Sequence, residues 1–208
     1  TLQGKTYADG PDGVGDKFYD MLRETRAVPK TSAPRPSRWL DAMNEAAEIG
    51  DSIVCITLAA RLSAAFDSAR VAVDMLKDSR PDLEVTVVDS ETAAGSQALI
   101  ALAAARAASA DGTHRQVTAA AQRALEGVRL LAYLDTLEYV WRSGRVPRVA
   151  VWATSILRMK PVMEFSRGAV GSIARPRSRP KAMERILSEM ARDVGALPVH
   201  VIVMHADA

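Results

Sequence analysis

The chain has 208 residues, 25% of them charged, and a formal net charge of +2 at pH 7, which gives no support to a nucleic-acid-binding protein. Its length suits one large domain or two small ones. A single cysteine excludes an internal disulfide framework, the apolar stretch 98–110 is too short to span a bilayer, and no signal peptide is visible, so we expect a cytoplasmic protein.

Short apolar runs alternate with helical patterns through the first 127 residues. Helices are expected at 16–26, 37–47, 63–79, 92–110 and 114–126, and strands at 52–58 and 83–88. Apolar strands separated by helices are typical of a parallel sheet with right-handed crossovers. The sequence therefore predicts an N-terminal α/β domain over residues 1–127.

The pattern changes after residue 127. We expect a strand at 128–134, a short helix at 135–143, helical spacing at 147–157, and a β-hairpin formed by 162–165 and 170–173. A helix at 178–195 and a last strand at 199–204 follow. Residues 128–208 are thus predicted to form a second, incomplete α/β domain, because another helix would be expected where the chain stops.

Two short loops with hydroxyl groups and small side chains point to a bound anion. Thr31 and Ser32 lie in a proline-interrupted segment, and Ser63 and Ala64 lie where a strand gives way to a helix. A helix N-terminus offers free backbone N–H groups and the positive end of the helix dipole. These loops are therefore candidates to hold one carboxylate or phosphate, although hydroxyls at such places more often cap turns and helices.

Other chemical motifs are weaker. The sequence has no glycine-rich nucleotide loop and no nucleophile elbow, and His114, His200 and His205 are too scattered to predict a metal site. Asp89, at the end of an expected strand, is a candidate general base. We favour instead that Asp89 and Ser90 cap the following helix.

Basic residues gather in two places. The first group surrounds a glycine and the second follows the expected hairpin: Arg142, Arg145 and Arg148, then Arg175, Arg177, Arg179 and Lys181. Charge runs are most often solvated faces, but arginines can also dock an acidic protein or a headgroup. Arg177 would come close to the anion site if the second domain packs over the first. Only 5% of residues are aromatic, so stacking platforms for nucleic acid are missing.

Six motifs, in order along nearly the whole chain, resemble those of the DegV family of bacterial fatty-acid-binding proteins. They are Gly-Lys-Thr-Tyr-Ala-Asp-Gly at 4–10, Thr-Ser-Ala-Pro-Arg-Pro at 31–36, Leu-Ser-Ala-Ala-Phe-Asp-Ser-Ala at 62–69, Val-Asp-Ser at 88–90, the segment 137–146 with its Ser-Gly-Arg-Val end, and Lys-Pro at 160–161. Arg177 matches the arginine that follows the hairpin in that family.

The resemblance implies two α/β domains with one long-chain fatty acid buried between them and no cofactor. It implies that Thr31, Ser32 and Ser63, with Ala64 beside them, hold the carboxylate, and that Arg177 lies near it or near a partner. In some members a separate fatty acid kinase subunit phosphorylates the presented carboxylate. The chain is therefore expected to be a non-enzymatic lipid-binding carrier, with no metal, no nucleic-acid partner and no stable membrane insertion.

This sequence departs from the family pattern in several places. Ala64 and Ala65 stand where the family has Gly-Thr, and Ala59 and Ala60 where it has Ser-Ser, so the carboxylate would depend more on Ser63, Thr31 and backbone N–H groups. The family's first strand and its C-terminal helices with a glycine-flanked histidine are not matched. The chain is thus expected to be truncated at both ends.

Two alternatives remain open at this point. One is a phosphotransferase subunit related to dihydroxyacetone kinase, whose substrate domain resembles this fold and which would need His205 to hold a substrate carbonyl. The other is a regulatory interaction module whose arginines, Arg145 and Arg177, dock a protein.

Overall fold

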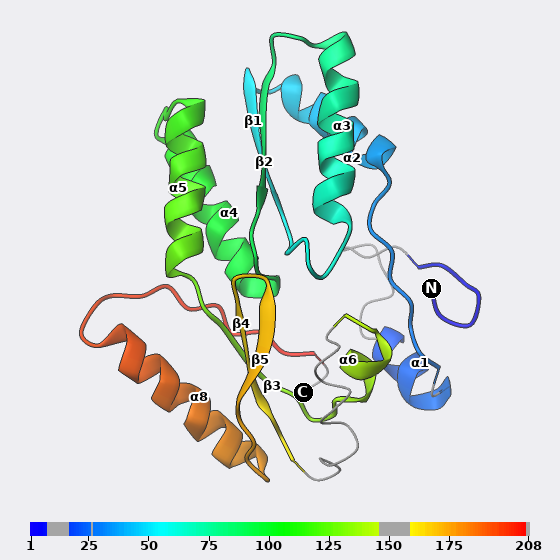
Figure 1. Ribbon diagram of the computed structural model, residues 1–208, viewed down its shortest axis with the longest axis vertical. Coiled ribbons are helices and arrows are strands. Elements are labelled where there is room, and N and C mark those ends of the chain that lie inside the picture. Colours follow the sequence, from blue (N-terminus) through cyan, green and yellow to red (C-terminus); the bar gives the residue numbers. More distant parts are fainter. Residues whose placement is uncertain (8–16, 26, 146–158, 207–208) are drawn as a thin grey trace.

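Two small sheets organise the chain, one parallel and one antiparallel (Figure 1). The computed structural model describes residues 1–7, 17–25, 27–145 and 159–206. In chain order the elements are α1 (Lys17–Thr25), α2 (Pro36–Ala47), β1 (Ser52–Thr57), α3 (Ala65–Ser79), β2 (Glu84–Asp89), α4 (Ala94–Ser109), α5 (His114–Gly127), β3 (Leu130–Tyr133), α6 (Glu138–Arg142), β4 (Val162–Ser166), β5 (Ala169–Ala174) and α8 (Arg179–Val194). This is the α/β fold that the sequence predicts.

The parallel sheet is the middle layer of three. β1 and β2 pair from Ser52 opposite Glu84 to Thr57 opposite Asp89. Helices α2 and α3 cover one face, and α4 and α5 cover the other (Figure 1). Successive side chains of a strand point to opposite faces, so Ile53 and Cys55 enter one apolar layer. Val54 and Ile56 enter the other, and both faces of β1 are therefore covered.

The two apolar layers have different compositions. The layer under α2 and α3 is built around the buried side chains of Met43, Ala69, Ala72 and Leu76. The layer under α4 and α5 is built around Ile100, Ala104, Val117 and Ala121. Half of these eight buried positions are alanine, and such small side chains let the helices approach the sheet closely.

The antiparallel sheet has the order β3-β4-β5. β4 and β5 form the hairpin that the sequence predicts, and α8 packs on β3 and β4. Met163 of β4 and Leu137 are buried together in a smaller cluster with Phe165 and Val170. The change from a parallel to an antiparallel sheet comes just after Gly127, where the predicted boundary between residues 1–127 and 128–208 lies; that division into domains stays a prediction.

Local signals explain several helix ends. Pro36 occupies the first turn of α2, where its missing N–H is not needed. Thr113 caps α5 with a reciprocal bond to Gln116. Gly195, with φ +54°, ends α8 in a conformation that side chains disfavour.

The last predicted strand is wrong. The segment 199–204 has the composition of a strand, but no strand forms over it, and its described residues are exposed. A strand needs a neighbour to complete its hydrogen bonds, and no described strand lies beside this segment. It runs instead past α4, where Ile202 and Met204 lie beside Gly95 and His200 Nδ1 lies 3.2 Å from Arg106 Nη1. The helical spacing at 147–157 lies outside the described residues.

Candidate functional site

The predicted anion site lies at the carboxyl ends of β1 and β2, where parallel sheets gather their ligands. Two loops meet there, one after Thr57 and one after Asp89. The N–H of Ser90 donates to the carbonyl of Thr57 over 3.1 Å, and the N–H of Ala59 donates to the carbonyl of Thr92 over 2.8 Å. The loops are therefore joined along their backbones.

Asp89 joins the same two loops through its side chain. One carboxylate oxygen, Oδ1, accepts from the N–H of Ala60 at 3.1 Å and from the N–H of Glu91 at 2.9 Å. The expectation that Asp89 and Ser90 cap the next helix is wrong, because α4 begins at Ala94 and its N-cap residue is Ala93. Charge-assisted hydrogen bonds of this kind are stronger than neutral ones, so Asp89 fixes the relative position of the loops.

Ser63 and Ala64 stand at the start of α3. Ser63 is half-buried, and its Oγ accepts from the N–H of Ala65 over 3.2 Å. This leaves the hydroxyl hydrogen of Ser63 to be donated to another group. Ala64 is the exposed N-cap residue and gives no side-chain cap, so the first turn of this 15-residue helix keeps free N–H groups.

Thr31 and Ser32 lie in an extended segment beside this helix end. Both residues are exposed. Ser68 Oγ, in the first turn of α3, donates to the carbonyl of Pro34 over 2.6 Å, which fixes the segment against the helix. Arg145 Nη2 donates to the carbonyl of Thr31 over 3.2 Å. The structure thus brings the two predicted loops to the same helix end, although no direct hydrogen bond joins Thr31 or Ser32 to Ser63 among the described residues.

Arg177 lies elsewhere. It is exposed in the segment between β5 and α8, next to Pro176, whose carbonyl accepts from the N–H of Lys160 over 2.7 Å. The part of the antiparallel sheet that touches the strand-end loops is the β4–β5 turn: the N–H of Gly168 donates to the carbonyl of Glu91 over 2.7 Å. Six residues of extended strand span about 20 Å, so Arg177 lies beyond the far end of β5 from that contact.

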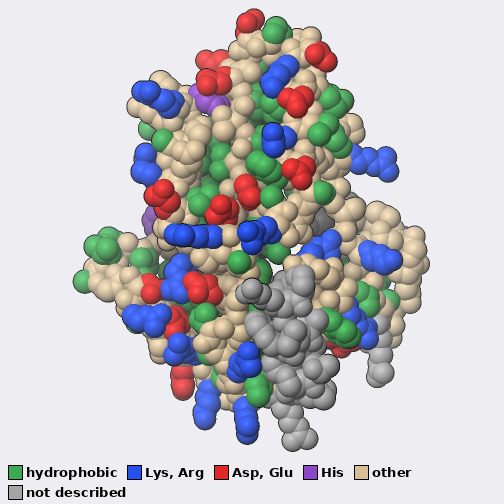
Figure 2. All heavy atoms as spheres, in the orientation of Figure 1, with side chains coloured by type: hydrophobic (Ala, Val, Ile, Leu, Met, Phe, Trp, Pro, Cys, Tyr) green, Lys and Arg blue, Asp and Glu red, His purple; other side chains and the backbone are tan. Residues whose placement is uncertain are grey.

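The two groups of basic residues lie in different parts of the molecule. Arg142 forms an ion pair with Glu138 within α6, and Arg148 lies outside the described residues. Arg179 lies over the ring of Tyr133, 5.8 Å from its centroid. Figure 2 shows Lys and Arg side chains gathered over the lower part of the visible face, around α8. The second basic group therefore belongs to the antiparallel half of the molecule.

The histidines do not form a site. His114 Nε2 lies 2.7 Å from Thr86 Oγ1, and its Nδ1 is buried without a hydrogen-bond partner among the described residues. His205 is exposed and does not follow a strand, so the structural premise for a substrate-holding role is lost. Within residues 1–7, 17–25, 27–145 and 159–206, no group of His, Cys, Asp or Glu is placed to hold a metal ion.

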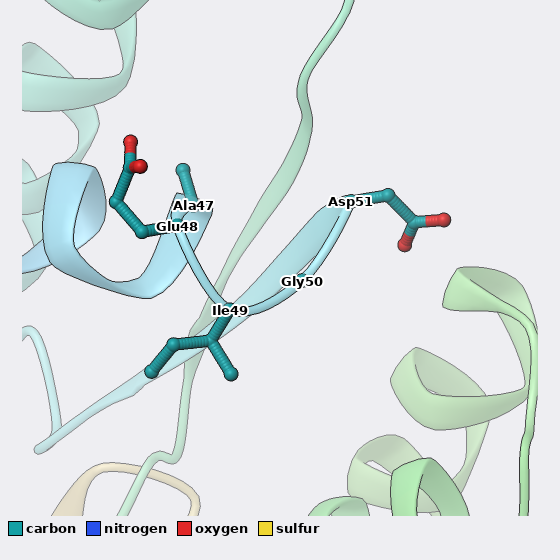
Figure 3. Close-up of a pocket in the computed structure, with 5 residues that line it drawn as sticks. All are labelled: Ala47, Glu48, Ile49, Gly50 and Asp51. Carbon is teal, nitrogen blue, oxygen red and sulfur yellow. The ribbon is translucent and has the colours of Figure 1, made fainter.

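Two open depressions in the described surface lie at the opposite end of the parallel sheet. Residues 47–51 line the first, and residues 79–83 contribute to the second. Figure 3 shows that the side chains of Glu48, Ile49 and Asp51 point away from one another. Convergent polar groups are what distinguish a binding pocket. Neither depression therefore competes with the strand-end loops as a candidate site. None of the described helices is long and apolar enough to cross a membrane.

The sequence contains signals for some features of the site geometry and none for other features. Ser68 belongs to the motif at 62–69, so the sequence indicates that its hydroxyl lies near the site, but its bond to the carbonyl of Pro34 depends on the fold. Nothing in the sequence indicates that Gly168 meets Glu91, because these residues are far apart in the chain and only the fold brings them together.

Comparison with known proteins gives one consistent result. The model of the DegV family, described as uncharacterised proteins, matches residues 1–208. A DegV domain-containing protein of Streptomyces coelicolor is 34% identical over 209 residues, which covers 100% of this chain and 72% of the relative. A second one, from Caldanaerobacter subterraneus, is 27% identical, over 91% of this chain and 66% of the relative.

Solved structures similar to this chain also include members of the DegV family. A fatty-acid-binding DegV family protein from Thermus thermophilus superposes with a TM-score of 0.82 at 26% identity, over 94% of this chain and 68% of that one. A stearic acid-binding protein from Eubacterium ventriosum gives a TM-score of 0.80 at 27% identity, over 92% of this chain and 66% of that one. This chain thus spans about two thirds of the length of its relatives.

Proposed function

Because the chain belongs to the DegV family, we propose that it binds one long-chain fatty acid, with the carboxylate held at the carboxyl end of β1. Thr31, Ser32 and Ser63 donate hydroxyl hydrogen bonds to the carboxylate in this proposal. Free N–H groups near Ala64 add to them, together with the positive end of the α3 dipole. No metal or cofactor takes part.

One observation carries the proposal. The 2.6 Å bond from Ser68 to the carbonyl of Pro34 holds the segment of Thr31 and Ser32 against the first turn of α3, where Ser63 also lies. In this proposal we therefore place the hydroxyl groups of Thr31, Ser32 and Ser63, from two segments distant in the sequence, around the N-terminus of α3. Ser63 already accepts from Ala65, so its own hydrogen is available to an anion.

The apolar tail supplies most of the affinity in this proposal. Each buried methylene contributes about 0.8 kcal/mol, so a long acyl chain binds tightly even if the carboxylate is held by few groups. This matters here because alanines stand at 59, 60, 64 and 65. The relatives from Thermus thermophilus and Eubacterium ventriosum, described as binding fatty acid and stearic acid, support the choice of ligand.

The proposed activity is that of a carrier rather than an enzyme. The bound carboxylate is presented to a fatty acid kinase subunit, and Arg177, exposed on the antiparallel half of the molecule, contributes to that docking. The cytoplasm is the proposed setting. Charge reversal at Arg177, Arg177→Glu, is expected to abolish capture of the kinase while leaving the fatty acid bound.

The test of binding is native mass spectrometry of the intact chain followed by denaturing lipid extraction. We expect a stoichiometric fatty-acid adduct on the chain. The double variant Thr31→Ala with Ser63→Ala removes two hydrogen bonds to a charged group, each contributing about 1.5–3 kcal/mol, and should weaken stearate binding at least roughly a hundredfold.

A matched control is Ser79→Ala. Ser79 donates to the carbonyl of Leu76 at the other end of α3, so its loss should leave stearate affinity unchanged. Unchanged affinity in the Thr31 and Ser63 double variant would contradict the carboxylate assignment. A chain that takes up no stearate would contradict the proposed function itself.

A further inference from the structure

We propose that the β4–β5 turn positions the loop that carries Ser63, and that Arg61 is the positioning residue through which it acts. The expected change in stearate affinity rests on the proposed function, whereas the expected change in the order of the loop does not. The turn belongs to the antiparallel sheet and the loop to the parallel one, so the contact between them is a physical link from one half of the molecule to the other (Figure 1).

The turn is tightly defined. Arg167 and Gly168 are its two central residues, with φ +49° and φ +69°, the combination that a two-residue hairpin of the type I′ class requires. The strand that leads into it is fixed, since Val162 and Met163 of β4 are fully buried. The N–H of Gly168 then donates to the carbonyl of Glu91 over 2.7 Å. The hairpin therefore ends in a rigid tip set against the loop after β2.

Arg61 lies on this tip. A Cβ atom added at Gly168 would come within 3.2 Å of Arg61 Cδ and 3.5 Å of Arg61 Cγ. The aliphatic stem of Arg61 therefore packs on the bare backbone of the glycine. The guanidinium makes no hydrogen bond or ion pair with the described residues, so it is the stem and not the charge that makes the contact. Long charged side chains commonly bury their stems in this way.

The loop that contains Arg61 leads directly to Ser63. Its first part is anchored to the loop after β2, because Ala59 donates to the carbonyl of Thr92 and Ala60 donates to Asp89. Leu62 then donates back to Ala59 over 2.9 Å and closes a turn around Arg61. The alanines of this loop have little side chain to pack. Arg61 supplies a side-chain contact where its neighbours cannot, two residues before Ser63.

The test compares three variants of the 208-residue chain. Arg61→Ala removes the stem, Arg61→Met keeps an unbranched apolar stem and removes the charge, and Arg115→Ala removes an exposed cation on α5 as the matched control. Two quantities are measured: amide hydrogen exchange of peptides that cover residues 58–64 without ligand, and the dissociation constant for stearate. The thermal midpoint of each variant is measured alongside.

Arg61→Ala is expected to speed exchange in residues 58–64 and to weaken stearate binding roughly ten- to hundredfold, because a small displacement of a binding group is costly. The thermal midpoint should not change, since Arg61 is exposed. Arg61→Met and Arg115→Ala should match the wild type in all three measurements. Rescue by methionine distinguishes positioning by the stem from attraction by the charge.

Two results would overturn the inference. Wild-type exchange rates in Arg61→Ala would show that the hairpin tip does not hold the loop, whether or not stearate binds. Equal loss of affinity in Arg61→Met and Arg61→Ala would assign the effect to the charge. If the wild type takes up no stearate, the proposed function fails, and the exchange rates alone decide the positioning role.

A second variant tests the partner of Arg61. Gly168→Ala strains a positive φ and also displaces the Arg61 stem. Its effect on exchange in residues 58–64 should be smaller in an Arg61→Ala background than in the wild type, because only the strain remains. Equal effects in the two backgrounds would show that the two residues are not coupled.

Discussion

Cys55 is a thiol in an apolar layer. It lies in the middle of β1 and packs among the side chains under α2 and α3, next to Ile53 on the same face. Burial raises the pKa of the Cys55 thiol from 9.0 to about 11, because the thiolate loses its hydration there. The thiol is therefore un-ionised at neutral pH, and a nucleophilic role for it is disfavoured.

This shift predicts a specific loss of stability in alkaline solution. The pKa of the Cys55 thiol is higher in the folded chain, so between pH 9 and pH 11 only the unfolded chain releases the proton. Stability consequently falls as pH rises through that window, by at most about 2.7 kcal/mol. Urea unfolding of the wild type and Cys55→Ala at pH 8 and pH 10.5 should show a shallower fall in the variant; parallel falls would contradict the prediction.

Among the elements, α5 shows how a local signal stabilises a helix. The N–H of Gln116 donates to Thr113 Oγ1, and Gln116 Oε1 accepts from the N–H of Thr113 over 2.8 Å. Both partners of this reciprocal pair satisfy N–H groups that a helix start leaves free.

Loss of this cap has a measurable cost. Thr113→Ala should lower the free energy of unfolding by about 1 kcal/mol, while Thr113→Ser should retain most of the stability because it keeps the hydroxyl. Urea unfolding followed by circular dichroism checks both. Equal stabilities of the alanine and serine variants would show that the bond to Gln116 contributes nothing.

The interior of α3 predicts a larger effect. Leu76 is only 2% exposed and packs with Met43, Ala69 and Ala72, whereas its neighbour Met75 is 44% exposed. Leu76→Ala should cost about 2–5 kcal/mol, because it leaves a cavity under a close-packed layer. Met75→Ala should stay within about 0.5 kcal/mol of the wild type. Similar losses of unfolding free energy in the two variants would contradict the placement of Leu76 in the apolar layer and of Met75 outside it.

The sequence predicted most elements because their signals are local. Apolar runs, prolines and glycines mark where β1, α3, β2 and α4 begin and end, and the structure agrees within about two residues at most ends. The capping role of Asp89 was wrong because the chain bends at Glu91 and Thr92 before the helix begins after Ala93, and the carboxylate instead accepts from Ala60. Local patterns cannot show which distant amide a carboxylate will meet.

At the scale of the whole molecule, long-range contacts decide what sequence patterns could not. Residues 199–204 have strand composition without a neighbouring strand, and they pass α4 beside Gly95. The predicted site shows the same division. The position of Ser63 just before a helix followed from the sequence, whereas the docking of Gly168 on Glu91 and Arg61 required the tertiary fold.

Arg129 shows how charges connect the antiparallel half. It precedes β3, and it forms ion pairs with Glu164 of β4, at 2.7 Å, and with Asp193 of α8. All three side chains are about two-thirds buried or more, so solvent screens them less than an exposed pair.

Removal of this link should destabilise the chain. Arg129→Ala removes the cation from Glu164 and leaves Asp193 only its 3.8 Å contact with Arg192, and we expect a loss of roughly 1–3 kcal/mol in the free energy of unfolding, between the values for exposed and buried pairs. Thermal unfolding at low and high salt checks this against Arg115→Ala, an exposed cation elsewhere. If the difference in stability between Arg129→Ala and the wild type disappears at high salt, the ion pairs of Arg129 act as exposed surface charges.

The three-layer arrangement has a consequence for the alignment of β1 and β2. A strand with one polar face resists slipping by one residue, because the slip would expose its apolar side chains. β1 is apolar on both faces, so either arrangement would bury Ile53, Val54, Cys55 and Ile56. Resistance to slipping must then come from the strand ends, where Ser90 bonds to Thr57 and Asp89 bonds to Ala60. The bonds that shape the proposed carboxylate site therefore also keep the central strands in register.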